Sequence, residues 1–149
     1  MSRDFEELIK VIETLRSSNG CPWDRKQTHD SLKTLLIEEV YELVSAIEEK
    51  DKEKIVEELG DIIIHIIFHA DIGKKEKKFF IHEILQNATL KLKRRHPHIF
   101  SSEKSNLNLK EVHKQWDKIK LEENKDPLSL IKNIPNHLPS LLKSASLYS

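Results

Sequence analysis

The stretch LKTLLIEEVYELVSAIEEKDKEKIVEELGDIIIHIIFHADIG, residues 32–73, decides the fold of this protein. Its apolar residues recur every three or four positions, the spacing that gathers them on one face of an α-helix. We predict two helices from it, residues 28–50 and 52–72. The turn around Asp51 is so short that the two helices must pack antiparallel. Gly73 is the predicted C-terminal cap of the second helix.

The same helical spacing continues on both sides of this stretch. It predicts further helices over residues 3–16, 77–95 and 109–123, with a connecting loop over residues 17–27. Pro97 ends the helix 77–95, and Asn108 with Glu111 forms a capping box before the last helix. No segment alternates as a β-strand does. The predicted fold is therefore all-α, a four-helix-bundle core with an additional C-terminal helix.

Length and composition limit the organisation and location of the protein. The 149 residues suffice for one domain, and we assign residues 1–125 to it. Residues 126–149 hold three of the five prolines and are interpreted as an extension or linker. Because 25 basic residues balance 25 acidic ones, no nucleic-acid partner is expected. The longest apolar run is too short to cross a membrane, and the N-terminus does not resemble a signal peptide, so we predict a cytoplasmic protein.

Four acidic residues occupy unusual positions on the two central helices. Glu39 falls in the middle of the apolar stripe of helix 28–50, and Glu42 falls at its edge. Glu58 and Asp61 share one narrow polar sector of the otherwise apolar helix 52–72. Antiparallel packing lets these two acid pairs face each other, where ionised carboxylates repel unless a cation neutralises them. An all-oxygen ligand set favours Mg²⁺, with Mn²⁺ as a substitute.

These acids allow two other interpretations. Two acids three residues apart on a charged helix are commonly just a solvated face. A di-iron site requires Glu-x-x-His on two helices, and that spacing occurs nowhere in the chain. His65 and His69 share the polar sector with Lys54, and we interpret both histidines as buried, hydrogen-bonded core residues rather than ligands.

Several motifs together resemble one family. Residues 20–24 read GCPWD, residues 38–42 read EEVYE, residues 58–61 read ELGD and residues 94–100 read RRHPHIF. This set is similar to the MazG-like nucleotide pyrophosphohydrolases, in particular to the first domain of tandem-domain members. The resemblance implies a magnesium site whose ligands and catalytic groups are the four carboxylates Glu39, Glu42, Glu58 and Asp61. It also implies that the basic residues Lys54, Lys91 and Arg95 contact phosphates.

The same resemblance implies a reaction and an assembly. The reaction would be metal-dependent hydrolysis of NTPs and dNTPs to the nucleoside monophosphate and pyrophosphate, in nucleotide-pool housekeeping. Trp23 either stacks on the base or packs its loop onto the bundle, with the loop lining the nucleotide pocket. A homodimer, or a dimer of dimers, would bury part of the apolar stretch 62–72 and of helix 77–95. Two alternatives stay open: a weakly active or non-catalytic nucleotide-binding and dimerisation module, and a specialised phosphoribosyl-ATP or deoxyuridine-nucleotide pyrophosphatase.

Overall fold

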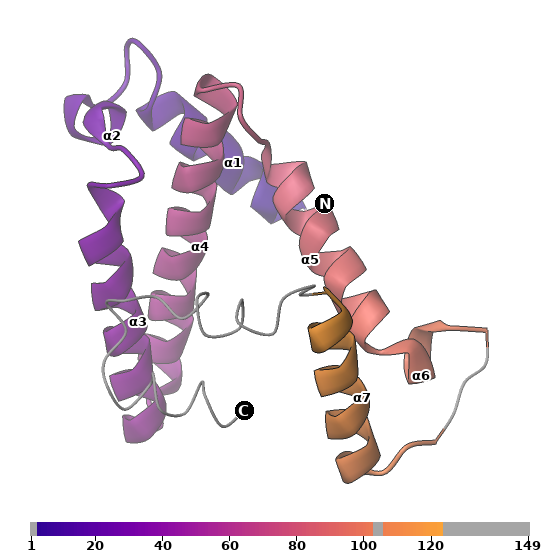
Figure 1. Ribbon diagram of the computed structural model, residues 1–149. Helices are drawn as coiled ribbons and strands as arrows, with labels where there is room; N and C mark the ends of the chain where they lie inside the picture. The colour runs from indigo at the N-terminus through magenta and orange to yellow at the C-terminus, as the bar shows by residue number, and fades with distance from the viewer. Residues whose placement is uncertain (1–2, 103–105, 124–149) are drawn as a thin grey trace. The chain divides into compact units, whose positions relative to one another are not determined.

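A computed structural model describes residues 3–102 and 106–123, and these ranges contain helices but no strand (Figure 1). The all-α prediction is therefore confirmed, while the predicted extension 126–149 lies outside the described residues. None of the described helices is long and apolar enough to cross a membrane. The helices are α1 Arg3–Leu15, α2 Pro22–Lys26, α3 Leu32–Glu49, α4 Lys52–Lys75, α5 Ile81–Arg95, α6 Pro97–Phe100 and α7 Leu109–Glu123.

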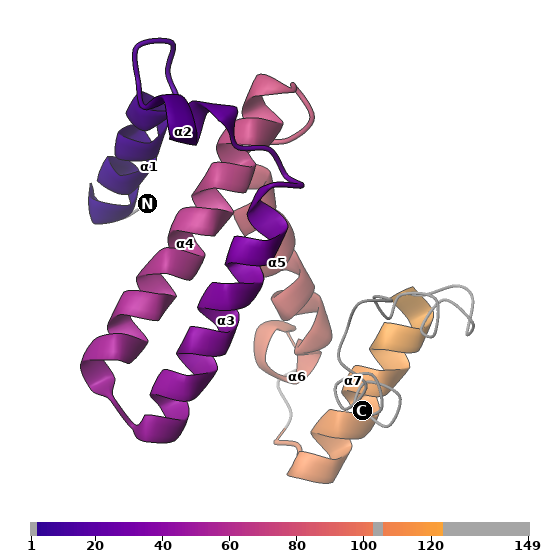
Figure 2. The ribbon, with the colours of Figure 1, turned by 90° about the vertical axis from the view of Figure 1, so that its left-hand side faces the viewer.

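The chain forms two compact units, the first ending at Gln86 and the second beginning at Asn87. In the first unit, α3 and α4 run antiparallel side by side, and α1 packs against the C-terminal half of α4 (Figures 1 and 2). The core lies where these three helices meet. Its buried side chains come from all three helices: Ile12, Leu32, Ile67, Phe68 and Ile72.

The turn between α3 and α4 follows from two residues. Lys50 adopts a left-handed conformation with φ of 57°, which ends α3. The Asp51 carboxylate then accepts hydrogen bonds from the backbone N–H groups of Glu53 and Lys54, at 3.0 and 3.2 Å, and so caps the start of α4. The predicted short antiparallel connection is confirmed.

The end of α4 differs from the prediction. The helix continues through Gly73 to Lys75, and left-handed backbone appears only at Lys77, with φ of 56°. Gly73 is instead buried inside the helix, where a Cβ atom would lie 2.6 Å from the ring of Phe79. The glycine therefore makes room for an aromatic ring rather than ending the helix. Because the chain turns between residues 76 and 80, α5 begins at Ile81 and not at residue 77.

The predicted loop 17–27 also contains a helix. Residues 22–26 form the short α2, because Pro22 occupies its first turn, where a missing backbone N–H costs nothing. In the second unit, α7 has the predicted bounds, and the capping box is confirmed. The Asn108 N–H donates to the Glu111 carboxylate at 2.8 Å, and the Glu111 N–H donates back to the Asn108 side chain at 3.1 Å.

Candidate active site

Three carboxylates of the first unit converge between α3 and α4. Glu39 of α3, with Glu58 and Asp61 of α4, each offer one oxygen atom, and the three atoms lie within 4.8 Å of one another. Glu58 is buried and the other two are partly buried. The arrangement follows from helical spacing, since Glu39 lies on the same face of α3 as the buried Leu32 and Ala46.

The electrostatics of this cluster favour a bound cation. Burial raises the pKa of Glu39, and the neighbouring charges of Asp61 and Glu42 raise it further. Burial also raises the pKa of Glu58, again with support from nearby carboxylates. Among the described residues, no ion pair involves Glu39, Glu58 or Asp61. Converging carboxylate oxygens without a cationic partner form a donor set that suits a hard divalent ion.

Two predicted site residues lie near the cluster but outside it. Glu42 is exposed and does not belong to the group of converging oxygens, although its charge contributes to the raised pKa of Glu58. Lys54 is in the first turn of α4, one turn before Glu58. Its ammonium group pairs with the Glu49 carboxylate at 3.1 Å, and this contact raises the pKa of Lys54.

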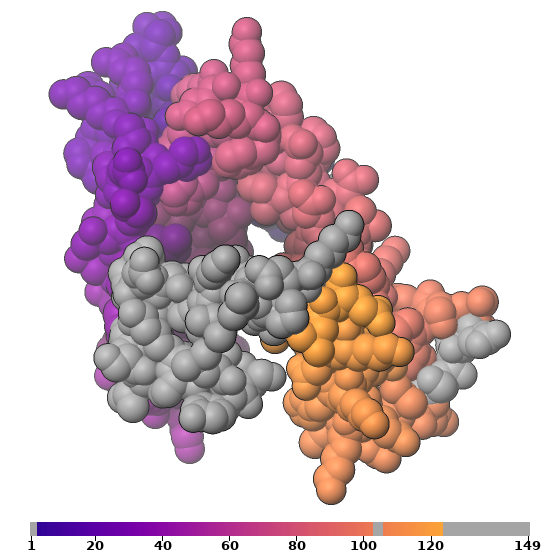
Figure 3. Space-filling model, viewed as in Figure 1, coloured from indigo at the N-terminus to yellow at the C-terminus, as the bar shows by residue number. Residues whose placement is uncertain are grey.

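A cavity of about 370 Å³ opens beside the cluster. Its polar side chains include Glu39 and Asp61, together with Asp24 and His65, and its apolar walls come from α1, α3 and α4. Trp23 of α2 also lines this cavity and is 58% exposed. The loop that carries Trp23 thus lines the cavity, and base stacking by the exposed Trp23 ring stays a prediction. In the space-filling view, α2 and the first turns of α3 lie at the surface at the upper left (Figure 3).

The two histidines of α4 are partly as predicted. His65 is buried, which lowers its pKa, but its Nδ1 atom has no hydrogen-bond partner among the described residues. His69 does have one, since its Nδ1 atom lies 2.7 Å from Nδ1 of His29. The predicted hydrogen bonding of His65 is therefore wrong for Nδ1. His65 also lines the cavity.

The remaining basic candidates belong to the second unit. Lys91 is exposed on α5. Arg95 forms an ion pair with Glu123 of α7 at 2.7 Å and lies over the ring of Trp116, with 5.3 Å between guanidinium carbon and ring centroid. The contacts of Arg95 with α7 give it a structural role within this unit. Phosphate binding by Lys91 and Arg95 stays a prediction.

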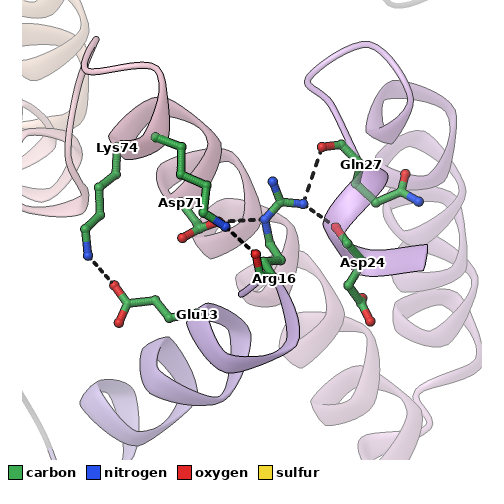
Figure 4. A network of polar contacts seen from close by, with 7 residues as sticks. Glu13, Arg16, Asp24, Gln27, Asp71 and Lys74 are labelled. Carbon is green, nitrogen blue, oxygen red and sulfur yellow. Dashed lines mark hydrogen bonds and ion pairs between the residues drawn. The ribbon is translucent and has the colours of Figure 1, made fainter. Parts of the chain in front are cut away.

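A buried ion pair that was not predicted from the sequence joins the end of α1 to α4. Nε of Arg16 donates to the Asp71 carboxylate at 2.6 Å, and both side chains are 4% exposed. Figure 4 shows the Arg16 guanidinium also reaching the backbone carbonyls of Asp24 and Gln27. A signal existed in the sequence, because Asp71 is a lone acid in an apolar stretch of helix and such a carboxylate needs a cationic partner.

Residues 27–100 match the sequence model of the MazG nucleotide pyrophosphohydrolase domain. The chain belongs to the MazG family. A MazG-related protein from Thermotoga maritima has a similar crystal structure, with a TM-score of 0.64 and 29% identity. That alignment covers 77% of this chain and 97% of the crystallised one, so the similarity in fold extends well beyond the two central helices.

Curated relatives agree with this assignment. The MazG nucleoside triphosphate pyrophosphohydrolase/pyrophosphatase of T. maritima is 47% identical over 80% of this chain and 45% of its own length. The nucleoside triphosphate pyrophosphohydrolase of Escherichia coli is 35% identical over 94% of this chain and 54% of its own. The Bacillus subtilis protein YabN, named as uncharacterized, is 43% identical over 97% of this chain and 29% of its own. This MazG chain thus spans between roughly a third and a half of these relatives.

Proposed function

We propose that this chain hydrolyses nucleoside triphosphates to the nucleoside monophosphate and pyrophosphate, with Mg²⁺ as cofactor. The observation that carries the proposal is the convergence of Glu39, Glu58 and Asp61, of which Glu39 and Asp61 line a cavity, in a MazG domain. The similar T. maritima and E. coli proteins, named as nucleoside triphosphate pyrophosphohydrolases, support the same reaction. Nucleotide-pool housekeeping of this kind would take place in the cytoplasm.

The proposed magnesium ligands are Glu39, Glu58 and Asp61, with Glu42 as the fourth carboxylate. Their oxygen-only chemistry fits magnesium, which Mn²⁺ would replace most readily. When bound, the ion would supply positive charge to the phosphate oxygens and lower the pKa of a coordinated water molecule. Because burial and neighbouring acids raise the pKa values of Glu39 and Glu58, protonation of these carboxylates should compete with metal binding as the pH falls.

The protein side chains supply the remaining functions. A carboxylate oxygen of Glu39 or Glu42 that is not used as a ligand would accept the proton of the attacking water. The cavity that Trp23 lines would hold the nucleoside. Lys54, in the same unit as the carboxylates, is a proposed phosphate contact whose positive charge would stabilise the charge that develops during phosphoryl transfer. Phosphate contacts by Lys91 and Arg95 are proposed from the sequence resemblance alone.

The test is a product analysis on a panel of NTPs and dNTPs with magnesium. We expect NMP and pyrophosphate in equal amounts, with free phosphate only after an inorganic pyrophosphatase is added. Direct release of NDP and phosphate would refute the proposed cleavage position. Nucleotide binding without turnover would instead support the alternative, a non-catalytic binding and dimerisation module.

The proposed assembly is a homodimer or a dimer of dimers. Within the predicted stretch 62–72, residues 67–72 except His69 are already buried in the first unit, whereas Ile63 and Ile66 are exposed. Further exposed apolar residues lie on α3 and earlier on α4: Ile37, Val40, Tyr41, Val44, Ile47, Val56 and Leu59. Many exposed apolar residues on two adjacent helices favour association. Light scattering that gives a 17.5 kDa monomer at micromolar concentration would contradict it.

A further inference from the structure

A buried arginine holds the segment that carries Trp23. The Arg16 guanidinium donates from Nε to the Asp71 carboxylate. Its Nη1 donates to the carbonyl oxygens of Asp24 and Gln27, the latter at 3.3 Å (Figure 4). It also lies over the ring of Phe68, 5.3 Å from the centroid. One side chain at the end of α1 thus contacts α4 on one side and the α2 segment on the other.

The α2 segment needs such an anchor. Five residues are too few for a helix to be stable by itself in water. The segment is further held by Gln27, whose side-chain amide donates to the Trp23 carbonyl at 3.0 Å and accepts from the Ser31 hydroxyl at 2.6 Å. Gln27 ties α2 to the start of α3, whereas Arg16 ties it to the buried face of α4.

The position of α2 affects the cavity directly. Trp23 and Asp24 line the same cavity as Glu39 and Asp61. Because Trp23 is largely exposed and packs little of its ring into the core, its place depends on the backbone that carries it. The backbone carbonyls that Arg16 holds belong to the residue after Trp23 and to the residue that ends α2.

We propose that Arg16, fixed by Asp71, is a positioning residue for substrate binding, which keeps Trp23 at the wall of the pocket where the nucleoside lies. The inference rests on the proposed function. Its consequence is specific to binding: loss of the anchor weakens nucleotide binding and leaves the carboxylate cluster on α3 and α4 intact. The lysine is the informative replacement at this position, since its donors all lie on one nitrogen, whereas the guanidinium bonds to Asp71 from Nε and to the two carbonyls from Nη1.

The experiment measures KM and kcat of Arg16→Lys with the panel nucleotide that the wild-type protein hydrolyses best. We expect KM to rise about tenfold while kcat stays within about twofold, the pattern of lost binding without lost chemistry. Asp71→Asn, which loosens Arg16 from its other partner, should raise KM in the same direction. Lys74→Ala is the matched control, because Lys74 joins α4 to Glu13 of α1 at 2.6 Å without contacting α2. It should leave KM unchanged.

A double-mutant cycle identifies the route of the effect. Trp23→Ala should raise KM by itself, and adding Arg16→Lys to it should raise KM no further, since both changes remove one interaction. Fully additive effects, or an unchanged KM in Arg16→Lys, would overturn the proposal. A fall in kcat alone would also overturn it, because that is the signature of a smaller folded fraction.

A second readout is independent of hydrolysis. The chain has two tryptophans, so Trp116→Phe leaves Trp23 as the only fluorophore of that kind. In that background, Arg16→Lys should increase acrylamide quenching of Trp23, and unchanged quenching would overturn the anchoring step. If the wild-type protein hydrolyses no nucleotide in the panel, the proposed function fails, while this measurement still decides whether Arg16 holds the segment.

Discussion

Glu39→Gln separates the electrostatic cost of the carboxylate cluster from its use. The substitution removes one negative charge and nearly preserves the shape of the side chain. Two unit charges 4.8 Å apart, the limit of the distances in the cluster, repel by about 1 kcal/mol in water and about 3.5 kcal/mol at an effective dielectric constant of about 20. Glu39 is only partly buried, so the lower end of this range applies.

We therefore expect metal-free Glu39→Gln to be more stable than wild type by about 1 kcal/mol, or roughly 2 to 4 °C in Tm for a chain of this size. Magnesium at a hundredfold excess over its Kd should stabilise wild type by about 2.7 kcal/mol. If the lost ligand weakens binding about a hundredfold, the same magnesium concentration stabilises the variant by only about 0.4 kcal/mol. Turnover should fall by at least about a hundredfold, the upper range measured for outer-shell partners of metal ligands.

Thermal melts with and without magnesium, together with the pyrophosphate assay, measure each of these quantities. Glu48→Gln is the matched control, because Glu48 is an exposed acid on the same helix outside the cluster. It should change neither the magnesium response nor turnover. The reasoning is refuted if Glu39→Gln melts upward with magnesium as wild type does and still hydrolyses nucleotide. In that case Glu39 is not a ligand.

Three further predictions concern stability. Gly73→Ala should destabilise the fold by about 1 to 3 kcal/mol, because the new Cβ clashes with the Phe79 ring. Gly60→Ala should instead stabilise α4 by up to about 1 kcal/mol, because no atom lies within 4 Å of its new Cβ. Denaturant titrations measure both changes. Asp71→Ala should cost about 3 to 5 kcal/mol in the same titrations, because it leaves a buried guanidinium without its carboxylate. Ion pairs with two arginines lower the pKa of Glu123 from 4.5 to about 2, so their stabilisation is complete above pH 4.5 and is lost as the pH falls toward 2. In Glu123→Gln, Tm should lose that part of its pH dependence, and an unchanged profile would contradict the assignment.

The sequence by itself determined the secondary structure and the acid positions of α3 and α4. Helical periodicity and capping are local properties, so the bounds of α7, its capping box and the turn at Asp51 follow from neighbouring residues. The same periodicity placed Glu39 on the buried face of α3 and Glu58 with Asp61 on one face of α4. The predicted end of α4 was wrong because its true end depends on a contact outside the local pattern. A glycine near a helix end favours a cap, and only the ring of Phe79 against it reveals the alternative.

Only the tertiary structure decided which of these side chains meet. Of the four predicted ligands, the oxygens of Glu39, Glu58 and Asp61 converge while Glu42 stays outside, a difference set by the rotation of α3 against α4. Arg16 and Asp71 are 55 positions apart, and neither shows in the sequence which residue it pairs with. Such contacts depend on how whole helices pack, because a rotation of a few tens of degrees moves a side chain from a buried face to solvent while leaving every local propensity unchanged.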